Sequence, residues 1–112
     1  MDMKLYLQNI EYISDTVSEH RLYEQLAEEC CELAQAALKM SRYLQNEDSV
    51  DMKKKEIYSK LDEEMTDVFV CLDTLHRRPN IDMELAAKKA NRWKDRINET
   101  MITDPEEAAL YE

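Results

Sequence analysis

Two segments of the chain carry the same pattern of acidic and apolar side chains. Residues 26–33 (LAEECCEL) and 61–68 (LDEEMTDV) each read apolar, any residue, Glu, Glu, two further residues, an acid and an apolar residue. On an α-helix, side chains three residues apart share a face, so Glu29 with Glu32, and Glu64 with Asp67, can each hold one cation. Only oxygen ligands are offered, which suit Mg²⁺ or Mn²⁺ better than zinc. The pattern therefore predicts a divalent-metal site suited to phosphate chemistry.

Both motifs lie in the same phase against an apolar stripe. The stripes consist of Leu22, Leu26, Leu33 and Met40 in the first segment, and Ile57, Leu61, Val68 and Leu75 in the second. Glu29 and Glu64 fall within these stripes. An unpaired carboxylate on a core-facing stripe is unfavourable, so we expect a cation between the two helices. The alternative is a solvated or ion-paired acidic face, since 36% of the chain is charged. The repetition in one phase favours the metal site.

A basic stripe follows later in the chain. Lys89, Arg92 and Arg96 are spaced to lie on one helical face. Beside an acidic metal site, this stripe is suited to hold a polyphosphate chain. The alternative is a solvated face that balances the many acids. Arg78, at the end of the preceding helix, is expected to contribute little.

The histidines suggest a second kind of metal site. Asp73 and His76 form one acid-x-x-His element, whereas carboxylate di-iron bundles use two Glu-x-x-His elements. Because the second element is missing, we interpret His20 and His76 as surface or boundary residues.

Four main helices are predicted to position these groups. With no glycine and two prolines, the chain favours helices over sheets with tight hairpins. The expected helices span about 3–17, 18–44 with Ser18 as cap, 51 or 52 to 78, and 80 or 82 to 99, with a polar connection at 45–49. This is an all-α, small four-helix bundle over residues 1–103, whose second and third helices form the central pair. Residues 104–112 are a tail or a short C-terminal helix.

Composition limits the remaining possibilities. At 112 residues the chain corresponds to one domain. Its net charge of -10 argues against a nucleic acid polymer as partner. There is no signal-peptide pattern and no apolar run of about 18 residues, so we expect a cytoplasmic protein with no membrane partner. Cys30 and Cys71 follow the apolar stripes and are expected to be small core residues.

The acidic quartet and the basic segment together resemble the MazG-like nucleoside triphosphate pyrophosphohydrolases, over about residues 12–97. This all-α superfamily also holds dimeric dUTPases and phosphoribosyl-ATP pyrophosphohydrolases. The resemblance implies that the metal ligands are Glu29, Glu32, Glu64 and Asp67. It also implies that Lys89-Ala90-Asn91-Arg92 corresponds to the substrate-binding K-x-N-R segment of short members. Many relatives have Gly in the first motif where this chain has Cys30-Cys31.

The implied reaction is NTP plus water giving NMP and pyrophosphate, with Mg²⁺ as cofactor and Mn²⁺ as a possible substitute. One of the four carboxylates would orient the water, and the sequence does not assign which. Asn91 and Trp93 are candidates for base selection, although Trp93 lies on the apolar side and is expected mainly in the core. The alternatives are dUTPase-like or phosphoribosyl-ATP hydrolysis, or a catalytically silent helical interaction module.

The central helices also carry further apolar residues away from the quartet. They are Tyr23, Ala27, Ala34 and Leu38 in the second helix, and Tyr58, Met65 and Phe69 in the third. One small bundle has limited capacity to cover two apolar faces, so we expect a homodimer or a dimer of dimers. The family resemblance implies the same. The alternative is that the first and fourth helices cover these residues within one chain.

Overall fold

The computed structural model describes residues 1–45 and 53–103, with side chains up to residue 100. Every regular element in these ranges is helical: α1 (Met3–Thr16), α2 (Glu19–Gln45), α3 (Lys54–Thr74), the short 3₁₀ helix η2 (Arg78–Asn80) and α4 (Met83–Thr103). The predicted all-α class is confirmed. The chain divides into two units, Met1–Arg78 and Pro79–Glu112, and each is described by itself. The predicted tail at 104–112 and residues 46–49 of the predicted connection lie outside the described residues.

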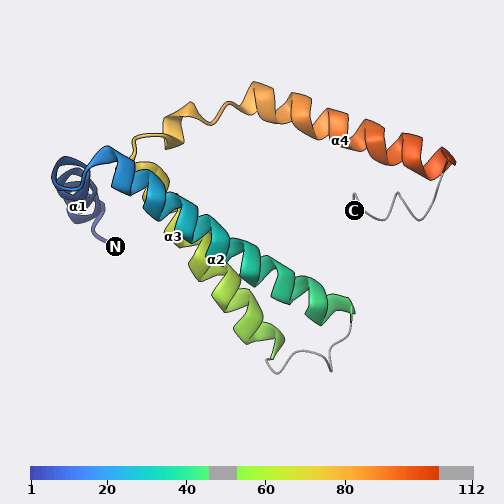
Figure 1. Ribbon diagram of the computed structural model, residues 1–112, viewed down its shortest axis with the longest axis horizontal. Coiled ribbons are helices and arrows are strands. Elements are labelled where there is room, and N and C mark those ends of the chain that lie inside the picture. The colour runs from blue at the N-terminus through green and yellow to red at the C-terminus, as the bar shows by residue number, and fades with distance from the viewer. Residues whose placement is uncertain (46–52, 104–112) are drawn as a thin grey trace. The chain divides into compact units, whose positions relative to one another are not determined.

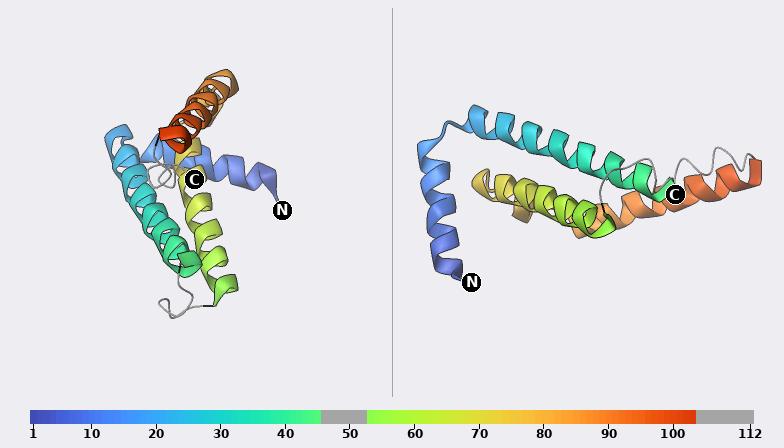
Figure 2. Two further views of the ribbon diagram at one scale, coloured as in Figure 1. Left: turned by 90° about the vertical axis from the view of Figure 1, so that its right-hand side faces the viewer. Right: turned by 90° about the horizontal axis from the view of Figure 1, so that it is seen from below.

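The first unit is built on α2 and α3, which lie side by side and run antiparallel (Figures 1 and 2). The apolar stripes predicted from the sequence face each other along this pair. Its buried apolar side chains are Leu22, Ala36 and Met40 from α2, and Ile57 and Cys71 from α3. The prediction that these two helices pack as a pair is therefore confirmed. The pairing brings the two acidic motifs to the same level of the hairpin.

Helix α1 lies across the end of the pair where α2 begins and α3 ends (Figure 2). Its start is fixed by Asp2, whose carboxylate accepts a hydrogen bond from the backbone N–H of Leu5 at 3.0 Å. This is an N-cap, which satisfies one of the free amides at a helix start. On the inner face, Ile10 is buried against the pair. Helix α1 thus closes one end of the hairpin.

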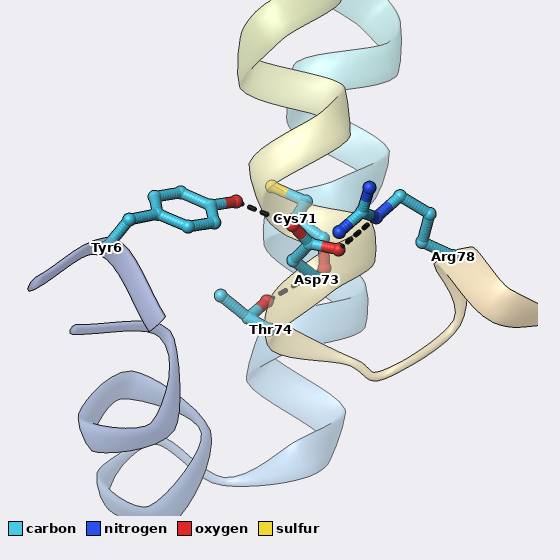
Figure 3. Close-up of polar contacts among 5 residues, drawn as sticks. All are labelled: Tyr6, Cys71, Asp73, Thr74 and Arg78. Atoms are coloured by element: carbon cyan, nitrogen blue, oxygen red, sulfur yellow. Dashed lines mark hydrogen bonds and ion pairs between the residues drawn. The ribbon is translucent and has the colours of Figure 1, made fainter. Parts of the chain in front are cut away.

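A buried carboxylate joins three parts of this end (Figure 3). The Tyr6 hydroxyl of α1 donates to Asp73 Oδ2 at 2.6 Å, and Arg78 Nε donates to Asp73 Oδ1 at 2.7 Å. Asp73 is 9% exposed, and each of its oxygens has a partner. Hydrogen bonds of this charged type each contribute about 1.5–3 kcal/mol. Arg78 also lies 4.5 Å from the ring centre of Phe69.

Helix α3 ends earlier than the sequence predicts. The expected end is at Arg77–Arg78, but the helix stops at Thr74. His76 has a left-handed backbone with φ of 56°, and the N–H groups of His76 and Arg77 return to the carbonyls of Asp73 and Leu72. This is a Schellman ending, in which glycine usually takes the left-handed position. His76 Nε2 and the Ser14 hydroxyl lie 3.0 Å apart and share a hydrogen bond, which links this turn to α1.

The cysteine prediction is half right. Cys71 is buried in α3, whereas Cys30 is exposed on α2, as is Cys31. Cys30 is wrong as a core residue because it lies about 80° around the helix from the buried Leu22 and Met40. Burial raises the pKa of the Cys71 thiol, and the nearby Glu29 adds to the effect.

The second unit contains α4. The predicted start at residue 80 or 82 is close to the observed one at Met83, and the Asp82 carboxylate accepts hydrogen bonds from the N–H groups of Glu84 and Leu85. The helix continues to Thr103, beyond the predicted end near residue 99. Within the ranges that the structure describes, no helix has the length and apolar character needed to cross a membrane.

Candidate metal centre

The four predicted carboxylates meet between α2 and α3. Glu29 and Glu32 project from α2, and Glu64 and Asp67 project from α3. One oxygen from each carboxylate lies within 4.8 Å of the others. Since the two helices are antiparallel, the two acidic motifs approach from facing walls. The structure therefore brings the quartet together as the repeated spacing predicts.

The depth of burial differs among the four. Glu64 is 2% exposed and is among the most deeply buried side chains described. Glu29 and Asp67 are intermediate, and Glu32 is open to solvent. This gradient follows the helical phase, since Glu64 lies within the apolar stripe and Glu32 at its edge. The cluster has a closed inner side and an open outer side.

Two oxygens of the quartet have no donor. Among the described residues, Glu29 Oε2 and Glu64 Oε2 are buried without a hydrogen-bond partner. Their sister oxygens are occupied: Gln25 Nε2 donates to Glu29 Oε1 at 2.8 Å, and Lys60 Nζ lies 2.7 Å from Glu64 Oε1. A buried carboxylate oxygen without a partner is costly. The quartet therefore has carboxylate oxygens that are free to bind a ligand and lie close to one another. In the described part of the chain, Lys60 is the cation that contacts it.

The pKa values reflect this crowding. Lys60 is the main cause of a lowered pKa at Glu64, and burial opposes it. The same contact with Glu64 raises the pKa of Lys60. Glu32 has a raised pKa, first because a proton on Glu32 can be donated to Glu64, and second because Glu29 repels its negative charge. Two ionised carboxylates have no proton with which to form a hydrogen bond to each other. When all four are ionised, the cluster therefore lacks positive charge.

These residues fit a hard divalent cation. All four ligands are carboxylates, the donor type that Mg²⁺ and Mn²⁺ prefer. Two of the free oxygens are buried, where a cation would replace the missing donors. The outer side of the cluster stays open at Glu32, which leaves room for substrate oxygens and water. The alternative from the sequence, a solvated or ion-paired acidic face, accounts for the contact between Lys60 and Glu64 but leaves Glu29 Oε2 and Glu64 Oε2 buried without a partner among the described residues.

A hollow of about 430 Å³ adjoins the quartet on the same two helices. It is lined by Glu32, Gln35, Ala36, Leu38, Lys39, Arg42, Lys60 and Glu64. Lys39, Arg42 and Lys60 were not predicted as site residues. Lys60 had a signal in the sequence, because it precedes Glu64 by four positions and can pair with it along the helix. Lys39 and Arg42 share the face of Glu32, but only the α2–α3 register places Lys60 opposite them.

The predicted substrate-binding residues lie on α4, in the second unit. Lys89 and Arg92 line one surface hollow of about 310 Å³ together with Trp93 and Arg96. The predicted basic stripe is therefore one continuous face. Asn91 is exposed, and its amide donates to Asp95 at 3.5 Å, within the same helix. Trp93 is 54% exposed, so the expectation of a core position is wrong.

Comparison with known proteins adds no relative from which a role could be transferred. The chain matches no protein-family model, no curated protein and no solved structure.

Proposed function

We propose that this chain is a metal-dependent nucleoside triphosphate pyrophosphohydrolase, as its resemblance to the MazG-like enzymes implies. The observation that carries the proposal is the pair of buried, unpartnered oxygens on Glu29 and Glu64. They lie inside a cluster of four carboxylates drawn from two helices. The cytoplasmic nucleotide pool is the expected source of substrate.

In the proposed reaction, the oxygen of a water molecule forms a bond to the α-phosphorus. The bond from that phosphorus to the bridging oxygen breaks, and pyrophosphate leaves with the electron pair. A bound Mg²⁺ or Mn²⁺ would supply charge neutralisation at the phosphate oxygens and a lowered pKa for the water. The protein's own contribution is to fix the four carboxylates on rigid helices, where the buried Glu64 and the partly buried Glu29 and Asp67 cannot swing away.

Glu32 is the best-placed member of the quartet to orient the water. It is exposed to solvent and also lines the adjoining hollow. Glu64 lines the same hollow but is buried and paired with Lys60. A carboxylate that borders both water and substrate can hold the attacking water by a hydrogen bond and accept its proton.

The test is a panel of nucleotides assayed for product identity. It includes natural and modified nucleoside triphosphates, dUTP and phosphoribosyl-ATP, so that the dUTPase-like and phosphoribosyl-ATP alternatives are covered. We expect a monophosphate and pyrophosphate as products, loss of activity with a chelator, and recovery with Mg²⁺ or Mn²⁺. Release of orthophosphate alone would contradict α–β cleavage. A panel with no turnover would favour the silent interaction module.

We also propose that the chain is a homodimer or a dimer of dimers. Tyr23, Tyr58, Met65 and Phe69 are each at least two-fifths exposed, although all four lie on the central helices. Apolar surface of this kind is typical of partner interfaces.

Light scattering at micromolar concentration should give a multiple of the chain mass, and Tyr23→Glu should reduce the measured mass. A single-chain mass for the wild type would defeat the proposal. Leu38 is a poor choice for this test, since it also lines the hollow beside the quartet.

A further inference from the structure

The hollow beside the quartet has a chemical character that the metal centre does not explain. Its lining combines the carboxylates of Glu32 and Glu64 with the cations Lys39, Arg42 and Lys60, and Lys60 lies 2.7 Å from Glu64 Oε1. Once a metal ion compensates the carboxylates, the three basic side chains dominate its charge. A hollow of this kind suits a ligand that is anionic along its length and begins at the metal.

Helix geometry connects the carboxylate of Glu32 with the α2 cations. Lys39 follows Glu32 by two helical turns, about 10.5 Å along the axis, and shares its face. Arg42 lies one further turn along. Side chains on a helix lean toward its N-terminus, which here means from Lys39 and Arg42 back toward the quartet. Both cations can therefore reach into the space beside Glu32.

Lys39 is partly exposed at the wall of the hollow. Among the described residues no ion pair is formed by Lys39 or Arg42, whereas Lys60 contacts both Glu63 and Glu64. The two α2 cations thus keep their charge available to a ligand in the hollow.

We propose that this hollow is the subsite for the leaving pyrophosphate, the β- and γ-phosphates of the substrate, with Lys39 and Arg42 as its ligands. The inference rests on the proposed function and deepens it. Arg42 can hold phosphate oxygens through two parallel N–H groups, and Lys39 acts as a point charge. The subsite belongs to the α2–α3 hairpin, so the phosphate tail is recognised by the same helices that hold the metal.

The experiment measures binding of inorganic pyrophosphate to the full chain by calorimetry, at saturating Mg²⁺. Lys39→Gln and Arg42→Gln should each weaken binding about tenfold, as expected for loss of a charge-assisted contact. Arg21→Gln is the matched control, because Arg21 is an exposed cation on the first turns of the same helix. Orthophosphate, which lacks the second phosphoryl group, should lose less affinity than pyrophosphate in the two variants. Mn²⁺ affinity should not change.

Two results would overturn the subsite. The first is that Lys39→Gln and Arg42→Gln bind pyrophosphate as tightly as Arg21→Gln does. The second is that the wild type does not bind pyrophosphate. Hydrolysis assays separate this failure from failure of the proposed function. Normal nucleotide hydrolysis in both variants would remove the subsite and leave the function standing. Pyrophosphate binding that depends on Lys39 and Arg42, in a protein that hydrolyses none of the nucleotides, would support the subsite and defeat the function.

Discussion

Helix α3 carries two buried carboxylates with opposite surroundings. Asp73 receives the Tyr6 hydroxyl on one oxygen and the Arg78 guanidinium on the other. Glu64 has Lys60 on one oxygen, no hydrogen-bond partner on the second among the described residues, and three further carboxylates around it. Asp73 is satisfied by the fold itself, which is what a structural ion pair requires. Glu64 is left short of positive charge, which is typical of a functional site.

Replacing each carboxylate by its amide should therefore have opposite effects: the change at Glu64 should lower activity, and the change at Asp73 should lower stability. Glu64→Gln removes a ligand charge with little change of shape, so activity should fall by about a thousandfold or more if the chemistry depends on the metal. The fold should be retained, because the change also removes repulsion among like charges. Nucleotide hydrolysis and circular dichroism measure the two effects. Full activity in Glu64→Gln would eliminate the site.

Asp73→Asn should lower stability and spare catalysis. The variant keeps one acceptor for Tyr6 but loses the charge that pairs with Arg78, a loss of about 1–3 kcal/mol. Denaturant unfolding measures the change, and activity per folded molecule should stay near that of the wild type. If Asp73→Asn lost activity while remaining fully stable, the distinction between the two carboxylates would be wrong.

Metal should stabilise the protein through Glu64. A ligand at about 100 times its dissociation constant adds about 2.7 kcal/mol to the free energy of unfolding. We therefore expect Mg²⁺ to raise the Tm of the wild type and of Asp73→Asn by several degrees. Glu64→Gln should show little or no shift. A rise of equal size in all three proteins would indicate general screening of the charge of -10.

The basic stripe of α4 should matter less than the quartet. Lys89→Ala and Arg92→Ala are expected mainly to raise KM or lower kcat/KM for the triphosphate, through lost phosphate contacts. Arg78, which looks dispensable in the sequence, is a poor control because it pairs with Asp73. Arg77, an exposed neighbour of Arg78, is the better choice. Equal effects in Arg77→Ala and the two α4 variants would indicate a general charge effect.

The smallest expected effect concerns Tyr6 and pH. Burial, followed by the hydrogen bond to Asp73, raises the pKa of Tyr6 from 10.0 to about 12. Because the neutral phenol is favoured in the folded state, its stabilisation is complete below pH 10 and is lost as pH rises through about 12. Absorbance of tyrosinate should show one late-titrating tyrosine that disappears in Tyr6→Phe. A wild-type titration with no late component would contradict the bond to Asp73.

Sequence reasoning succeeded where helical phase was sufficient. The shared face of the acids within each motif and the start of α4 near Asp82 depend on local sequence, which the chain displays directly. The buried oxygen of Glu64 follows from its place within an apolar stripe.

It failed where the answer depends on contacts between distant residues. One of the two partners of Asp73 is Tyr6, 67 positions away in the sequence, and no local pattern links the two. The end of α3 uses histidine in a left-handed turn, held to Ser14, where a glycine would have been a recognisable signal. Lys39 and Arg42 become site residues only through the register between α2 and α3.

The central claim, that the quartet is a metal centre, is tested most directly by equilibrium binding of Mn²⁺ to three proteins. The wild type and Asp73→Asn should bind with the same affinity and stoichiometry, and Mg²⁺ should compete. Glu64→Gln should bind at least about tenfold more weakly, because it loses the charge of the most buried ligand. Equal Mn²⁺ binding by the wild type and Glu64→Gln, or no saturable binding by the wild type, would contradict the account.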